Sequence, residues 1–142
     1  MDINEKLNSG FKATKEGKPF ALIIRGENGS GKTAFFRNFF ENNGIRYYQI
    51  ECKTLLPLGE KNAYDVTTED VLNFSLDGYD AVFFDAIDRA DNQVRELLLK
   101  KVKEIKEQNV FVGATCWPSA HYDREPIKEE VLKEYFDEVI DL

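Results

Sequence analysis

Short apolar runs recur along the chain, and segments with helical spacing separate them. The runs hold four to seven residues, a length that is typical of strands buried on both faces of a sheet. We predict five strands, at residues 20–24, 45–51, 81–84, 110–114 and 138–142.

The intervals between these runs carry helical patterns. Apolar residues recur every four positions from Ile3 to Phe11 and predict a short amphipathic helix before the first strand. Further helices are predicted over residues 34–41, over residues 92–107, and from a first turn at Pro126. The inward positions of these three helices are Phe35, Phe36, Phe39, Phe40, Val94, Leu98, Val102, Ile105, Ile127, Val131, Leu132, Tyr135 and Phe136.

Turn and capping signals lie between the patterned segments. Residues 15–19 contain glycine and proline and predict a turn into the first strand. Residues 53–66 have mixed polarity and predict a loop. Thr67 and Asp70 have the spacing of a capping box, which marks the start of another helix.

Strands that alternate with helices predict a parallel sheet covered by helices on both faces. The expected fold is therefore α/β, a three-layer αβα sandwich with a five-stranded parallel sheet. Residues 1–142 suit a single domain, with an N-terminal helix and turn in residues 1–19 and the core in residues 20–142. Ligands of such folds bind at the carboxyl ends of the strands.

Composition excludes several classes of function. Hydrophobic residues make up 42% of the 142 residues, which favours a packed core over disorder. The net charge of −7 argues against an autonomous nucleic-acid-binding module, which needs a basic face. The sequence lacks both the ~20 apolar residues that span a bilayer and the apolar stretch of a signal peptide. We expect a cytoplasmic protein that contacts no membrane.

Cysteine and histidine offer little chemistry. Cys52 and Cys116 lack the C-x-x-C spacing and are expected to be buried free thiols in a reducing compartment. His121 is the single histidine, and we expect it on a surface loop. These residues are too few for a His/Cys metal site.

The residues after the first predicted strand carry the most informative motif. It consists of Gly26, Glu27, Asn28, Gly29, Ser30, Gly31, Lys32 and Thr33, and it fits the P-loop pattern G-x-x-x-x-G-K-S/T. Glycines let such a loop turn tightly, so that successive backbone N–H groups face a phosphate. Lys32 can reach the terminal phosphates, the Thr33 hydroxyl can ligate Mg²⁺, and the following helix adds its N-terminal dipole. With this motif, the expected sandwich is of the P-loop NTPase type. The alternative is a glycine-rich turn that matches by chance.

Asp85 supplies a second part of the same site. It directly follows the apolar residues 81–84, and an acid at such a strand end can hold Mg²⁺ through water beside Thr33. A strand that merely ends in aspartate is the alternative. We expect ATP and Mg²⁺ as ligands, with Thr33 and Asp85 at the metal.

Residues 20–142 resemble the AAA+ ATPase superfamily. The resemblance rests on residues 26–33, 81–88, 110–119 and 134–142. Residues 111–118 are similar to the fourth strand and polar sensor of that family, and residues 135–140 are similar to its R-F-D-x-V-I segment. The resemblance implies an ATP-binding fold that works with a protein partner or by self-association.

The chain departs from the family pattern at four places. Ala86 stands where the family has the glutamate that orients the attacking water, and the next acid is Asp88. Cys116 aligns with the sensor asparagine, although the neighbouring Thr115 can donate a hydrogen bond instead. Tyr135 aligns with the arginine that acts on a neighbouring subunit's nucleotide, and no segment aligns with the C-terminal helical lid. Asp88 and Thr115 are therefore the candidate catalytic residues.

Three hypotheses follow. The leading one is an AAA+-like domain that binds Mg·ATP and hydrolyses it weakly or only with a partner. The second is a small nucleotide or small-molecule kinase, which the scarcity of lid arginines beyond Arg95 and Arg124 disfavours. The third is a non-catalytic scaffold subunit of a replication or remodelling assembly.

Overall fold

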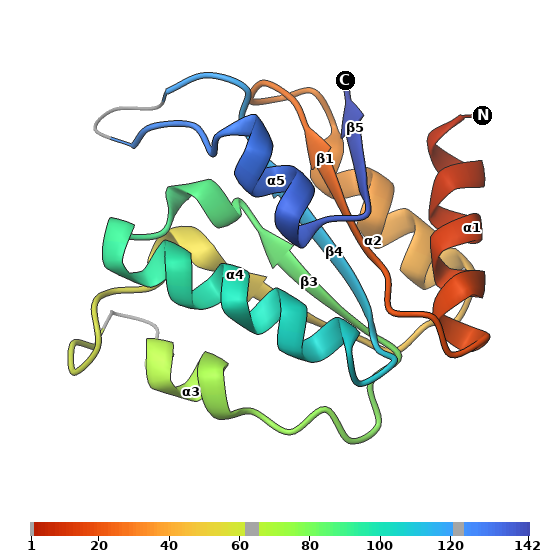
Figure 1. The fold of residues 1–142 in the computed structure, drawn as a ribbon, viewed down its shortest axis with the longest axis horizontal. Helices are drawn as coiled ribbons and strands as arrows, with labels where there is room; N and C mark the ends of the chain where they lie inside the picture. Colours follow the sequence, from red (N-terminus) through yellow and green to blue (C-terminus); the bar gives the residue numbers. More distant parts are fainter. Residues whose placement is uncertain (1, 62–65, 121–123) are drawn as a thin grey trace.

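The computed structural model describes residues 2–61, 66–120 and 124–142, and over these residues five parallel strands form one sheet (Figure 1). The strands are β1 (Ala21–Arg25), β2 (Tyr47–Glu51), β3 (Ala81–Asp85), β4 (Phe111–Cys116) and β5 (Glu138–Asp141). Their order across the sheet is β2-β3-β4-β1-β5. The predicted parallel sheet is therefore confirmed.

Helices cover both faces of this sheet. Along the chain they are α1 (Ile3–Lys15), α2 (Lys32–Asn42), α3 (Thr68–Asn73), α4 (Asn92–Lys106) and α5 (Glu129–Tyr135), with short 3₁₀ turns η1 (Cys52–Thr54) and η2 (Ile87–Arg89). Helices α1 and α2 lie on one face, and α3, α4 and α5 lie on the other (Figure 1). The three-layer αβα sandwich predicted from the sequence is confirmed.

Alternation along the strands divides the core into two clusters. Leu22 and Ile24 point toward α1 and α2, whereas Ala21 and Ile23 point toward α4 and α5. Because both faces of the central strands are buried, these strands are apolar at nearly every position. Phe36, Phe39 and Phe40 of α2 are buried in the first cluster, and Phe35 packs partly buried at its margin.

Several local predictions agree with the structure. The capping box of Thr67 and Asp70 is present at the start of α3. Cys52 and Cys116 are both buried free thiols. The predicted surface position of His121 lies outside the described residues.

The expected helix start at Pro126 is wrong. Helix α5 begins at Glu129, and its N-cap residue Lys128 has extended backbone angles. Ile127 is buried in the core cluster that α4 and α5 share. An extended segment before the helix lets this side chain reach the core, so burial of Ile127 accompanies the later start.

Register places the ends of the central strands side by side. Arg25, the last residue of β1, is opposite Cys116 of β4 and Asp141 of β5. On the other side of β4, Phe84 of β3 is opposite Ala114. The residues that follow β1, β3 and β4 therefore meet at one edge of the sheet, where ligands of this class of fold bind.

Candidate nucleotide site

The loop between β1 and α2 depends on glycine for its shape. Gly29 and Gly31 have φ angles of +83° and +86°, a region that residues with a Cβ rarely adopt. Gly31 is the N-cap of α2, so the helix begins at Lys32, two residues before the predicted start. The Gly26 N–H donates to the Cys116 carbonyl at 3.0 Å, which anchors the loop to the end of β4.

Lys32 lies inside the curve of this loop. The residue is 7% exposed, and its Nζ donates to the Glu27 carbonyl at 3.2 Å. Burial lowers the pKa of the ammonium, although the nearby Asp88 and Asp85 carboxylates partly offset this effect. A desolvated cation gains much from an added anion, so the loop is suited to a phosphate.

The two predicted metal ligands, Thr33 and Asp85, are in contact in the structure. The Thr33 hydroxyl donates to Asp85 Oδ1 at 3.1 Å. The Thr115 hydroxyl donates to the same oxygen at 2.9 Å and accepts from the Ala86 N–H at 2.8 Å. One hydroxyl and one carboxylate at this separation fit Mg²⁺, which keeps several waters and needs few protein ligands.

Thr115, one of the two candidate catalytic residues, forms its hydrogen bonds within the protein. It is fully buried, and its hydroxyl forms hydrogen bonds with Asp85 and with the Ala86 N–H at the end of β3. In this structure the side chain holds the Asp85 carboxylate in place. Its predicted role toward the substrate remains a prediction.

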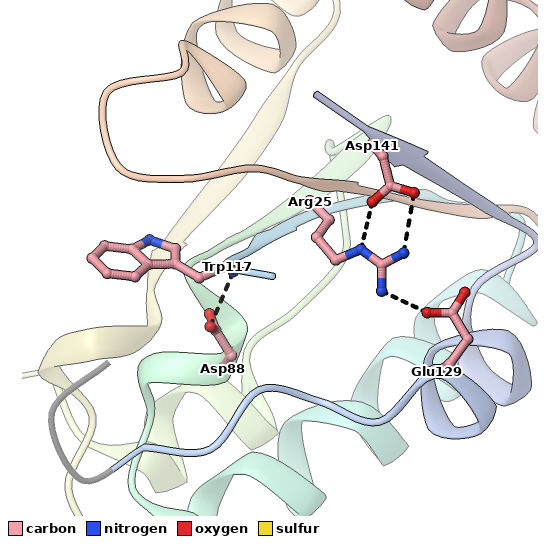
Figure 2. Close-up of polar contacts among 5 residues, drawn as sticks. All are labelled: Arg25, Asp88, Trp117, Glu129 and Asp141. Carbon is pink, nitrogen blue, oxygen red and sulfur yellow. Dashed lines mark hydrogen bonds and ion pairs between the residues drawn. The ribbon is translucent and has the colours of Figure 1, made fainter. Parts of the chain in front are cut away.

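Asp88 is a buried acid beside the loop. It is 2% exposed and lies in η2, and its Oδ2 accepts the Trp117 N–H at 3.0 Å (Figure 2). Its Oδ1 has no hydrogen-bond partner among the described residues. Burial raises the pKa of this carboxyl, while hydrogen bonds and the charges of Arg95 and Lys32 oppose the rise. An unpaired buried oxygen is costly, so a water or ligand atom at Oδ1 would be stabilised.

Ala86 turns the chain between Asp85 and Asp88. Its φ and ψ are 55° and 54°, a left-handed conformation that costs roughly 1–2 kcal/mol for a residue with a Cβ. Such strain is found at functional sites when the surroundings hold it in place. Here the hydrogen bond from the Ala86 N–H to Thr115 provides that support. The sequence pattern alone did not indicate this turn.

Trp117 and Arg89 are site residues that the sequence analysis missed. The Lys32 Nζ lies 5.7 Å from the centroid of the Trp117 ring, and the Arg89 Cζ lies 5.4 Å from the same centroid. Both distances are within cation–π range. The available signal was one tryptophan directly after the aligned sensor position and one arginine directly after Asp88.

An ion-pair cluster fixes the base of the loop. Arg25 directly precedes Gly26, and its Nε and Nη2 donate to the two Asp141 oxygens at 2.5 and 3.1 Å. Its Nη1 donates to Glu129 at 2.6 Å (Figure 2). The two carboxylates raise the pKa of the guanidinium. The cluster joins the end of β1 to β5 and α5, and because it is close to the surface its energy is modest.

The loop and the start of α2 line an open cavity of about 360 Å³. Its walls comprise Asn28, Gly29, Gly31, Lys32, Thr33, Ala34 and Arg37. This volume lies in the range of small-molecule sites.

Within the part of the chain that the structure describes, no cluster of three or more His, Cys, Asp or Glu side chains could hold a metal by itself. In the same ranges, no helix is long and apolar enough to cross a bilayer.

Comparison with solved structures identifies the fold. A variant of RuvB from Thermotoga maritima matches with a TM-score of 0.57 and 21% identity, over 99% of this chain and 44% of its own. A second RuvB variant from the same organism matches with a TM-score of 0.58 and 20% identity, over 97% of this chain and 44% of its own. These matches show that this chain has the same fold as the matched part of RuvB, an α/β fold of the P-loop NTPase type. No protein-family model and no curated protein sequence matches the chain.

Proposed function

We propose that the chain binds Mg·ATP through the loop of residues 26–33 and hydrolyses it slowly or only with a partner. The observation that carries this proposal is the contact of Thr33 with Asp85 at 3.1 Å, beside a buried Lys32 inside the same loop. A cation, a hydroxyl and a carboxylate thus converge where the backbone of a P-loop faces phosphate.

Each residue has a distinct role in this proposal. Lys32 holds the terminal phosphates, Thr33 binds Mg²⁺ directly, and Asp85 binds it through water. Thr115 keeps the Asp85 carboxylate in position through its hydrogen bond of 2.9 Å. The metal ion, when bound, neutralises charge that develops on the phosphate oxygens.

In this proposal, the chain alone hydrolyses ATP slowly, because two residues of the family pattern are replaced. Ala86 has no carboxylate to orient a water, and Tyr135 stands where the family has an arginine. Asp88 is the acid that can replace the missing glutamate, because its Oδ1 is buried beside Lys32 and has no partner in the described ranges. We assign the positioning of the attacking water to this oxygen.

The protein partner of this chain forms the next part of the proposal. This chain spans less than half the length of the RuvB chains that it matches, so their remaining segments have no counterpart in the comparison. We propose that the domain acts by self-association or with a protein partner, within an assembly that handles DNA. The net charge of −7 implies that any basic DNA-binding surface belongs to another component.

Calorimetry with Mg²⁺ and a non-hydrolysable ATP analogue tests the binding step. We expect Lys32→Ala to weaken binding roughly 10- to 100-fold, because it removes a charge-assisted contact to phosphate. Lys100→Ala is the matched control, since Lys100 is an exposed lysine of α4 whose one ion pair among the described residues is with Glu96 at 3.8 Å. Equal affinity of wild type and Lys32→Ala, or no binding by either, would rule the proposal out.

The Lys32→Ala variant also distinguishes the proposed ATP-binding domain from a non-catalytic scaffold subunit. If a partner is recovered with the chain, a scaffold assembles equally well with wild type and with Lys32→Ala. An ATP-dependent subunit loses that assembly when Lys32 is replaced. Transfer of phosphate from ATP to an added nucleotide would instead favour a kinase.

A further inference from the structure

Two cationic side chains of the site, Lys32 and Arg89, lie within cation–π distance of the same aromatic ring. The indole of Trp117 has Lys32 Nζ at 5.7 Å and Arg89 Cζ at 5.4 Å from its centroid. The two charges can therefore be no farther apart than the sum of these distances. Since Lys32 belongs to the phosphate-binding loop, Arg89 lies within the same small region of the site.

Arg89 also lies on the terminal-phosphate side of the site. It is the last residue of η2, four positions after Asp85 and next to Asp88. Asp85 and Thr33 would hold Mg²⁺, which would neutralise charge on the outer phosphates. The turn that carries Arg89 is thus at the end where the γ-phosphate would lie.

The guanidinium of Arg89 is not committed to a carboxylate. Among the described residues it takes part in no ion pair within 4 Å, whereas Arg25 pairs with Asp141 and Arg124 lies 3.9 Å from Asp91. Arg89 is half-buried and stacks on Trp117. Stacking restricts the side chain while its N–H donors stay available for a phosphate oxygen pair.

We propose that Arg89, held against Trp117, is a second cation for the γ-phosphate and makes the site prefer ATP to ADP. This inference rests on the proposed nucleotide site. Arg89 supplies a positive charge at the outer phosphate from within the chain, whereas Tyr135, which aligns with the arginine that acts on a neighbouring subunit's nucleotide, supplies none. The preference arises because ADP lacks the phosphate that Arg89 contacts.

Affinity for the two nucleotides tests the assignment. With Mg²⁺ present, we expect Arg89→Ala to weaken binding of a non-hydrolysable ATP analogue roughly 10- to 100-fold and to leave ADP affinity within about threefold. Arg89→Lys should recover part of the loss, because it restores the charge without the bidentate geometry. Arg46→Ala is the control, since Arg46 is an exposed residue directly before β2, beside Gly78.

Tryptophan emission gives a second readout that a purely structural role would not move. The chain has one tryptophan, so its fluorescence reports on Trp117 alone. We expect the ATP analogue to change this emission more than ADP does, because only the ATP analogue has a γ-phosphate to bind the guanidinium that lies against the ring. The difference between the two nucleotides should disappear in Arg89→Ala.

The outcomes separate this inference from the proposed function. If Lys32→Ala weakens both nucleotides while Arg89→Ala weakens neither, or weakens both equally, the role of Arg89 is refuted and the nucleotide site stands. If Lys32→Ala also changes nothing, the nucleotide site itself is refuted. Circular dichroism of each variant confirms that the fold persists.

Discussion

Asp88 is 2% exposed, accepts one hydrogen bond from the Trp117 N–H, and has a second oxygen without a partner among the described residues. Burial raises the pKa of its carboxyl above the ordinary value of 3.8. The folded state therefore holds the proton more tightly than the unfolded chain does. Ionisation of Asp88 therefore lowers the free energy of unfolding. We infer that the acid is kept at this position, despite the loss of stability, because it serves catalysis.

Replacing Asp88 by asparagine should separate stability from turnover. Below pH 3.8 the acid is protonated in both states and costs nothing; as pH rises through the raised pKa, the wild type loses stability and Asp88→Asn does not. At neutral pH, the free energy of unfolding of Asp88→Asn should exceed that of the wild type by about 1 kcal/mol. This difference should become smaller as the pH falls toward 4. Urea unfolding between pH 4 and pH 8 measures it.

The same variant should hydrolyse ATP more slowly than the wild type while binding it as tightly. Unchanged turnover in Asp88→Asn would contradict the assignment of the attacking water to Asp88. A gain in stability that does not depend on pH would contradict the stated origin of the raised pKa.

At the scale of elements, one glycine sets how closely α2 approaches the sheet. A Cβ built on Gly113 of β4 would lie 2.4 Å from Phe36 Cε1. Phe36 is fully buried and packs on Phe83 with ring centroids 4.8 Å apart. Because the ring is buried and packed between α2 and the sheet, we infer that the missing Cβ of Gly113 lets α2 lie close to the sheet and so sets the position of Lys32 and Thr33 relative to the strand ends.

We expect Gly113→Ala to lower the free energy of unfolding by about 1–3 kcal/mol, the usual cost of overpacking a core. It should also weaken ATP binding, since α2 is displaced. Urea unfolding and calorimetry measure the two effects. Adding Phe36→Leu to Gly113→Ala should recover part of the stability by removing the clash. A double variant no more stable than Gly113→Ala would argue against this contact as the cause.

Element positions were largely predictable because they depend on local patterns. The apolar runs predicted every strand of the described sheet to within two residues at either end, and aromatic spacing identified the buried face of α2. Helix ends were less predictable. Helix α5 begins at Glu129 and not at Pro126, because tertiary burial of Ile127 outweighs the preference of proline for a first helical turn.

At the scale of the whole molecule, ligand binding should stabilise the fold. A ligand that binds only the folded chain adds about 2.7 kcal/mol at a concentration 100 times its Kd. For a chain of 142 residues this corresponds to a rise in Tm of roughly 5–10 °C. Thermal denaturation with Mg²⁺ and the ATP analogue measures it.

Controls for this stabilisation follow from the proposed ligands. The rise should shrink when a chelator removes Mg²⁺ and should be lost in Lys32→Ala. A similar rise in Lys32→Ala would mean that the nucleotide binds elsewhere on the protein.

The sequence by itself determined the parts of this protein that depend on local chemistry and on strand order. The glycine spacing of residues 26–33 specifies a backbone that few other residues can adopt. The apolar run before Asp85 specifies a buried strand, and parallel strands bring their carboxyl ends to one edge. Contact of Thr33 with Asp85 follows from these two facts, and the structure has it at 3.1 Å.

Only the tertiary structure decided how the remaining site residues pair. Arg25 meets Asp141 across 116 positions of sequence, Trp117 lies beside both Lys32 and Arg89, and Asp88 keeps one oxygen unpaired. These relations depend on which distant segments pack together and on how completely they exclude water. Side-chain burial and partner choice are properties of that packing, and a linear pattern of residue types does not contain them.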